Sequence, residues 1–109
     1  MAMVINRFDV YLINLDPTIG SEIQKTRPCL IVSPDEMNRH IRTVIIAPMT
    51  TAGKDYPTRI SCEFKKKKEQ IVLDQIRTID KTRLIKKLGS IHPETQLEVI
   101  SVLQRLFAF

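Results

Sequence analysis

The sequence is poor in the residues from which metal centres, redox sites and phosphate loops are built. It contains 2 cysteines, 2 histidines and 3 glycines, without a Cys-x-x-Cys pair, a His-x-x-x-His pair or a glycine-rich phosphate loop. No serine or cysteine stands in a nucleophile-elbow motif. We therefore expect neither a metal nor a cofactor. Cys29 and Cys62 lie in separate apolar runs and are interpreted as reduced core residues.

Long apolar segments are also missing. No run approaches the ~18 residues that a membrane-spanning helix requires. Asn6, Arg7 and Asp9 interrupt the N-terminal segment that a secretion signal would need to keep apolar. A length of 109 residues predicts one domain over residues 1–109. A chain of this size buries about 60–70% of its unfolded surface, which is enough for a core. We expect a cytoplasmic protein.

Positive charge is in excess, with a net charge of +5 and a pI of about 9.5. This balance permits an anionic partner, such as a nucleic acid or an acidic protein, but many small domains carry a similar charge. The Lys65–Lys68 run is flanked by Glu63 and Glu69. This pattern is more typical of a solvated hairpin connection than of an RNA contact.

Short strands separated by polar turns dominate most of the chain. Runs rich in β-branched and aromatic residues predict strands at Phe8–Leu15, Arg27–Ser33, Arg42–Met49, Thr58–Phe64 and Gln70–Ile79. The segments "DPTIGS" and "TTAGKDYP" have the composition of turns. Between the second and third strands, Pro34–His40 is expected to form one helical turn or a loop. The continuous apolar centre of the third strand indicates burial on both faces.

Helices are expected at the C-terminal end. Asp80 can cap a short helix that runs through Leu88, with Gly89 in the position of a helix-ending glycine. Pro93 is expected near the start of a last helix. The apolar stripe of that helix comprises Leu97, Ile100, Leu103, Leu106 and Phe107. The pattern favours a core position for this stripe over a dimer surface. Strands followed by helices predict a small β-barrel or a strongly curved sheet with helices against it.

Two polar loops, 18–26 and 50–57, adjoin apolar strands and carry the best candidates for chemistry. If the first three strands are neighbours, Arg27 and Thr50 lie close together at one end of the sheet. A guanidinium fork matches phosphate oxygens and stays charged, and a hydroxyl beside it can donate to the same phosphate. The residues alone leave open that Arg27 is a surface charge paired with Glu22. They indicate a small basic β-rich domain that is compatible with nucleic-acid binding.

Four segments in order, "DVYLINLDPTIGSE", "RPCLIVSP", "IIAPMTT" and "DQIRTID", resemble the MazF/PemK-type toxin endoribonucleases of bacterial type II toxin–antitoxin modules. The resemblance implies an SH3-like β-barrel with appended helices, including a C-terminal helix, that works as a homodimer. It implies metal-independent cleavage of single-stranded RNA at short sequences, which leaves 2′,3′-cyclic phosphate and 5′-hydroxyl ends and inhibits growth. It also implies a cognate MazE-like antitoxin whose acidic, disordered C-terminal segment covers the RNA site.

The resemblance assigns three catalytic candidates. The arginine of the family's "RP" motif falls on Arg27, the catalytic threonine after the third strand falls on Thr50, and the glutamate of "GSE" falls on Glu22. Arg27 is expected to stabilise charge at phosphorus and to protonate the leaving oxygen, and Glu22 is the candidate base. RNA contacts are expected from Ser21, Lys25, Thr26, Thr51, Lys54, Asp74, Gln75 and Arg77.

The chain departs from the family pattern at two positions. Asp74 falls where the PemK-like branch has a carboxylate assigned as base, but the arginine that precedes it by two residues in that branch is Val72 here. The Arg27/Thr50 version of the site is therefore favoured. Phe8 stands where relatives usually have a glycine before the aspartate.

Two alternatives of other classes remain. CcdB-type toxins of the same fold class bind DNA gyrase and cleave nothing, which would make this chain a binding module. Those proteins end in a tryptophan-containing helix tip, whereas this chain has no tryptophan and ends "RLFAF". An RNA-binding domain without catalysis is the other alternative, and it would bind RNA without releasing product.

Overall fold

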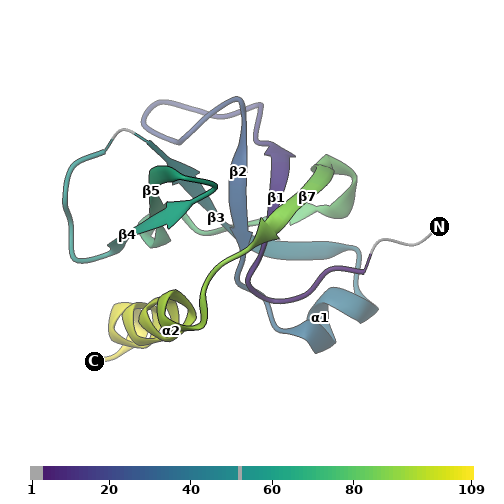
Figure 1. The fold of residues 1–109 in the computed structure, drawn as a ribbon. Coiled ribbons are helices and arrows are strands. Elements are labelled where there is room, and N and C mark those ends of the chain that lie inside the picture. Colours follow the sequence, from purple (N-terminus) through teal and green to yellow (C-terminus); the bar gives the residue numbers. More distant parts are fainter. Residues whose placement is uncertain (1–3, 52) are drawn as a thin grey trace.

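One strongly curled antiparallel sheet forms the body of the molecule (Figure 1). The computed structural model describes residues 4–51 and 53–109. In this part of the chain the strands are β1 (Asp9–Asn14), β2 (Thr26–Ile31), β3 (Thr43–Thr50), β4 (Arg59–Phe64), β5 (Lys67–Val72), β6 (Arg77–Asp80) and β7 (Leu84–Ser90). The helices are α1 (Asp35–His40) and α2 (Pro93–Phe107), and two 3-10 turns are η1 (Leu73–Gln75) and η2 (Lys81–Arg83). The expected turn at Pro34–His40 is therefore α1.

Strand β3 is the centre of the sheet, whose order is β4-β5-β3-β2-β1-β7. One edge of β3 pairs with β2, and the other edge pairs first with β6 and then with β5. The predicted single strand Gln70–Ile79 is wrong in this respect, because η1 interrupts it. The interruption has a physical reason: β5 joins β4 in a second wing of the sheet while β6 stays on the first half of β3, and one straight strand cannot follow both.

Alternation along the strands fills two separate apolar clusters. Val10 belongs to the cluster that packs against α2, whereas its neighbour Tyr11 belongs to the cluster on the other side. Fully burying one such aliphatic side chain contributes about 1.5–3 kcal/mol. Cys29 is buried and free, and burial raises the pKa of its thiol to about 12. Cys62 is half-buried and free, and its pKa rises to about 11, again mainly through burial. Cys29 is thus a core residue as expected, whereas Cys62 lies only partly in the core.

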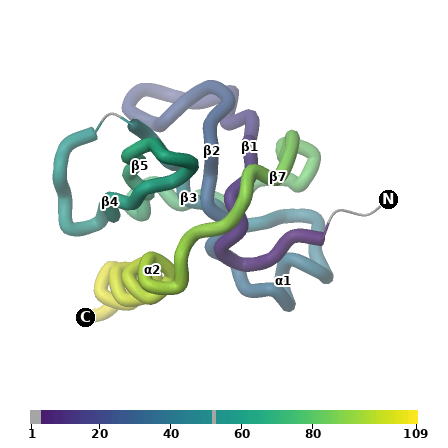
Figure 2. Tube along the Cα trace, in the orientation of Figure 1, coloured from purple at the N-terminus to yellow at the C-terminus, as the bar shows by residue number. Residues whose placement is uncertain are grey.

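The predicted helix from Asp80 through Leu88 is wrong. Asp80 does cap a turn, accepting a hydrogen bond from the Thr82 amide, but this turn ends at Arg83. The chain then forms β7, which pairs along β1 and lies beside it in Figure 2. Lys87 Nζ reaches the buried Asp9 carboxylate at 3.3 Å. The open edge of β1 therefore decides the structure of this segment, and local helix signals do not.

Gly89 does not end a helix but lies in β7, opposite Val10 and next to a register shift. Its φ is 154°. A Cβ at this position would lie 3.4 Å from the Phe64 ring. Glycine is therefore used here for backbone conformation and close packing within a strand.

The last helix is confirmed as α2, with Pro93 in its first turn. The core position predicted for its apolar stripe is largely wrong. The buried residues of α2 are Val99 and Val102, which were not assigned to the stripe. Of the stripe, Leu103 packs partly buried against the core, while Leu97 and Phe107 are 74% and 72% exposed. The helix contacts β4 and η1 and lies below β4 in Figure 1, so residues off that line of contact remain on the surface.

Phe8 precedes β1 with a φ of 74°, in the region that glycine adopts without cost. The backbone at this position therefore has the conformation that favours glycine, the residue of the family pattern, although this chain has phenylalanine. The Phe8 ring packs against the core, which offsets the strain.

Two substitutions of Phe8 separate the effect of its backbone conformation from the packing of its ring. Phe8→Gly should have a higher free energy of unfolding than Phe8→Ala, by about 1 kcal/mol, because both lose the ring but only alanine holds a Cβ at positive φ. Urea unfolding of the two variants measures this difference. Alanine as the equal or better replacement would contradict the role of the backbone conformation.

Candidate active site

A groove of about 390 Å³ lies where β2 begins and β3 ends. We call it the Arg27 groove; its walls are Lys25, Thr26, Arg27, Pro28, Met49, Thr50, Thr51, Lys67 and Glu69. The β2–β3 register pairs Cys29 with Pro48, and two residues further along each strand it reaches Arg27 and Thr50. The structure thus brings the two main catalytic candidates together at one end of the sheet.

Arg27 is half-buried and held by its own loop. Its Nε donates to the carbonyl of Gln24 at 2.9 Å, which fixes the plane of the guanidinium. Thr50 is 8% exposed and ends β3, so its backbone is set by the central strand. A cationic fork and a hydroxyl in one groove form a site suited to a phosphate group.

Glu69 and Lys67 also line this groove, and sequence reasoning did not assign them to it. Lys67 belongs to the Lys65–Lys68 run that was interpreted as a hairpin connection, and Glu69 flanks that run. That interpretation is confirmed for Lys65 and Lys66, which form an exposed two-residue turn with φ of 51° and 64°. The two-residue period of a strand could have indicated that Lys67 and Glu69 belong to β5, because they share one face of it with the core residue Ile71.

Glu69 has an unusual environment for a carboxylate. It is 6% exposed and lies opposite Cys62 in the β4–β5 register. Burial raises its pKa above the ordinary value, and the positive charges of Lys67 and Arg27 act in the opposite direction without cancelling the effect.

Glu22 lies in a neighbouring groove of about 280 Å³, with Asp74, Gln75 and Arg77 among its walls. It is exposed, and its Oε1 accepts a hydrogen bond from the Ile19 amide at 2.6 Å. Glu22 therefore shapes its own loop, and the structure does not bring it into the Arg27 groove.

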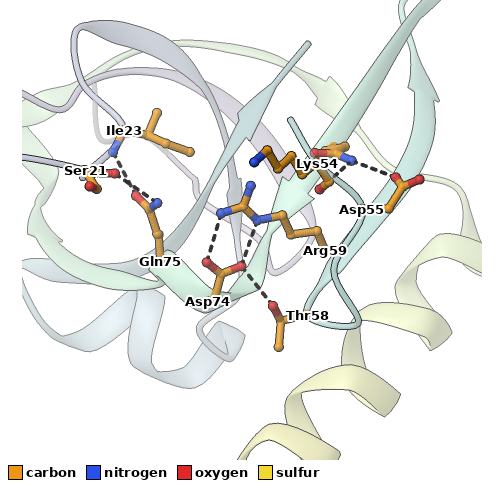
Figure 3. A network of polar contacts seen from close by, with 9 residues as sticks. Ser21, Ile23, Lys54, Asp55, Thr58, Arg59, Asp74 and Gln75 are labelled. Atoms are coloured by element: carbon orange, nitrogen blue, oxygen red, sulfur yellow. Dashed lines mark hydrogen bonds and ion pairs between the residues drawn. The ribbon is translucent and has the colours of Figure 1, made fainter. Parts of the chain in front are cut away.

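Gln75 fixes the first polar loop (Figure 3). Its Oε1 accepts from the Ile23 amide at 2.8 Å, and its Nε2 donates to the Ser21 carbonyl at 3.3 Å. Arg77 donates from Nη1 to the Leu15 carbonyl at 3.1 Å. Three residues expected to contact RNA thus take part in hydrogen bonds that position the loop.

Asp74 has an arginine partner that the sequence did not reveal. Arg59 donates to both carboxylate oxygens, at 3.1 and 3.2 Å, and Thr58 adds a bond of 3.0 Å (Figure 3). Arg59 of β4 lies opposite Val72 in the β4–β5 register, so β4 supplies the arginine that is missing at position 72. Partial burial acts to raise the Asp74 pKa, but these donors hold it below the usual range. Asp74 is therefore a weaker base than a free aspartate.

Gln70 anchors the second polar loop. Its Nε2 donates to the Lys54 carbonyl at 3.4 Å and to Asp55 Oδ1 at 3.3 Å, as Figure 3 shows around Lys54 and Asp55. Thr51 is exposed at the entrance of the Arg27 groove, and Lys54 is exposed in the loop. Ala52 of this loop lies outside the described residues.

In residues 4–51 and 53–109, no group of three or more His, Cys, Asp and Glu side chains is arranged to hold a metal ion. No helix in the same ranges is long and apolar enough to cross a membrane.

Comparison with known proteins identifies the family. The model of the PemK-like, MazF-like toxin of type II toxin–antitoxin systems matches residues 6–107. The chain belongs to this family. It is 40% identical over 106 residues to the endoribonuclease MazF of Staphylococcus epidermidis, a match that spans 92% of this chain and 88% of that protein.

Solved structures agree on the fold. The crystal structure of MazF from Deinococcus radiodurans superposes with a TM-score of 0.87 at 23% identity, covering 99% of this chain and 100% of that one. An endoribonuclease from a mycobacterial species, solved in complex with its cognate antitoxin, has a TM-score of 0.80 at 25% identity and covers 95% and 97%. The predicted family, the barrel-like fold with a C-terminal helix and the endoribonuclease class are confirmed. The relatives favour the nuclease over the gyrase-binding alternative.

The Arg59–Asp74 pair gives a stability prediction. Asp74→Asn should lower the free energy of unfolding at neutral pH by about 1 kcal/mol or less, the size expected for a pair near the surface. Because the Asp74 pKa is lowered on folding, the pair stabilises the protein above the ordinary aspartate pKa, and this contribution is lost as pH falls through the lowered pKa. The difference from wild type should therefore vanish in strong acid.

Urea unfolding at neutral and strongly acidic pH measures this effect, with Glu36→Gln, an exposed change in α1, as the control. A deficit of Asp74→Asn that persisted unchanged in acid would show that the ion pair is not its cause.

Proposed function

We propose that this toxin is a sequence-specific endoribonuclease that cleaves single-stranded RNA, including mRNA, in the Arg27 groove. The observation that carries the proposal is the meeting of Arg27 and Thr50 in one groove with lysines at its edge. The identity of the matched relatives supports the same activity.

RNA supplies the nucleophile, because its ribose carries the 2′-hydroxyl that DNA lacks. The 2′-oxygen attacks the adjacent phosphorus, the P–O5′ bond breaks, and the products carry a 2′,3′-cyclic phosphate and a 5′-hydroxyl. Arg27, and not a metal ion, supplies positive charge at the phosphorane and protonates the departing 5′-oxygen. Thr50 donates a hydrogen bond to the phosphate and orients it. The remaining requirement is a base for the 2′-hydroxyl proton.

The RNA strand is positioned by residues around this groove. Lys25, Thr26 and Thr51 line it, and Lys54 lies in the loop beside it, so these four are proposed to contact the RNA. Asp74, Gln75 and Arg77 line the neighbouring groove, and Gln75 bonds the Ser21 carbonyl beside it, so these four residues are proposed to contact the RNA there. The loops 18–26 and 50–57 are proposed to set the cleavage sequence.

We propose two partners, an antitoxin and a second copy of the chain. A cognate MazE-like antitoxin with an acidic disordered segment would cover the basic groove, which the mycobacterial complex with its antitoxin supports. A homodimer is proposed as the working form, and the exposed Leu97 and Phe107 on α2 are compatible with it. We also propose that residues 1–109 form a single toxin domain, which acts in the cytoplasm, where its RNA substrate is found.

Arg27→Ala should abolish cleavage while the fold is retained, because the variant removes the permanent charge at phosphorus. The measurement is incubation of purified protein with long single-stranded RNA in excess EDTA, followed by mapping of the RNA ends. Arg42→Ala, which removes an exposed arginine before β3, is the control and should cut like wild type. Wild-type cleavage by a folded Arg27→Ala protein would remove Arg27 from the mechanism.

Thr50→Ala should slow cleavage by about 100-fold or more, equivalent to the loss of one catalytic donor at ~3 kcal/mol. Thr50→Ser retains the hydroxyl and should recover most of the rate. Single-turnover cleavage of one oligonucleotide by the three proteins gives the comparison. Equal rates for the alanine and serine variants would show that the hydroxyl has no part in the reaction.

A further inference from the structure

Glu69 is a buried carboxylate that folding does not explain. It is 6% exposed, and within the described part of the chain its Oε2 has no hydrogen-bond partner. A buried charged group is normally paired or fully hydrogen-bonded, because the loss of hydration is otherwise uncompensated. Gln70, the next residue, also has a buried oxygen without a partner, Oε1, but it is a neutral amide and its nitrogen has two partners in the loop. A structural role would be served better by a neutral side chain at position 69.

The position of Glu69 points to a use in chemistry. Glu69 lines the Arg27 groove together with Arg27 and Thr50, and it also lines the adjoining groove under the second loop. The charges of Arg27 and Lys67 act on it directly. The carboxylate therefore shares a groove with the two residues proposed to hold the scissile phosphate.

We infer that Glu69 is the general base that accepts the 2′-hydroxyl proton of the RNA, an inference that rests on the proposed function. As the 2′-oxygen bonds to phosphorus, its proton passes to the Glu69 carboxylate. The P–O5′ bonding pair leaves with the 5′-oxygen, which takes a proton from Arg27. Exchange with water then deprotonates Glu69 and reprotonates Arg27, so the balance closes without another reactant.

The environment of Glu69 suits this role. A general base is most effective when its pKa lies near the working pH, and burial raises the Glu69 pKa in that direction. Arginine, with a pKa above about 12, is a poor base. Glu69 shares its two grooves and its strand pair with six other titratable or charged groups: Lys25, Arg27, Asp55, Cys62, Lys67 and Lys68. Among them, the positive charges of Lys67 and Arg27 favour the ionised carboxylate that a base requires and act against the effect of burial.

Glu22 is a weaker candidate for the same step. It is exposed in the neighbouring groove, and its Oε1 is bonded to the Ile19 amide. The two glutamates can be separated by experiment, because each can be changed to glutamine without altering its shape.

The test compares Glu69→Gln, Glu22→Gln and the matched control Glu63→Gln, an exposed residue in β4. Single-turnover cleavage is followed from acidic to neutral pH, and binding is measured with a 2′-O-methyl oligonucleotide that cannot react. Wild type should lose rate on acidification as Glu69 becomes protonated. Glu69→Gln should lose about 10²–10⁴-fold of the rate, lack that acidic limb and bind the inert oligonucleotide as wild type does. Glu63→Gln and Glu22→Gln should retain the limb.

A stability measurement guards against a misfolded variant. Because glutamine removes a buried charge, Glu69→Gln should unfold at an equal or higher urea concentration than wild type at neutral pH. Wild-type rate and pH profile in Glu69→Gln, or loss of the acidic limb in Glu22→Gln instead, would overturn the inference while the endoribonuclease stands. No cleavage of any RNA by folded wild-type protein would overturn both proposals.

Discussion

The pairing of β3 with three strands is the constraint on which the rest of the molecule depends. One edge of β3 pairs with β2 around Ile46 to Pro48, and its other edge is shared by β6 and β5 in succession. The sheet must therefore divide into two wings beyond the middle of β3. The Arg27 groove opens at the end of this strand, with Thr50 from β3, Arg27 from β2 and Glu69 from β5 around it. Each of these three residues lies in a strand, where backbone pairing limits its movement.

Residues 70–75, which connect the two wings of the sheet, hold both polar loops in place. Gln70 at the start of this segment bonds the second loop, and Gln75 at its end bonds the first. Between them, Asp74 forms an ion pair with Arg59 of β4. Arg59 also lies over the Tyr56 ring, 4.9 Å from its centroid, so the far end of the second loop is tied to the same segment. The loops around the groove are thus positioned by one stretch of backbone that the central strand itself fixes.

The sequence predicted the features that depend on local chemistry. Turn residues marked both loops, apolar runs marked β1 to β4, and the ordered motifs identified the family and the position of Arg27 and Thr50. Features that depend on contacts between distant segments were missed. The strand β7 forms because β1 needs an edge partner, and the Arg59–Asp74 pair exists only through the β4–β5 register. Neither contact can be predicted from residues that are neighbours in the sequence.

Glu69 was missed for a different reason. Four preceding lysines gave its segment the composition of a solvated surface, and composition averages over the two faces of a strand. Lys65 and Lys66 lie in the turn and Lys68 lies on the other face of β5, so these lysines are exposed while Glu69 is buried. The same averaging affected α2, whose predicted apolar stripe runs from the partly buried Leu103 to the exposed Leu97 and Phe107.

The glutamine anchors have a consequence for how such a toxin can diversify. Gln75 bonds the amide of Ile23 and the carbonyl of Ser21, and one bond of Gln70 ends on the carbonyl of Lys54. These are backbone atoms, which almost every residue type presents in the same way. Side chains of the loops can therefore change over generations without releasing the loops from the sheet. Recognition of new RNA sequences and preservation of the cutting apparatus then become separate evolutionary problems.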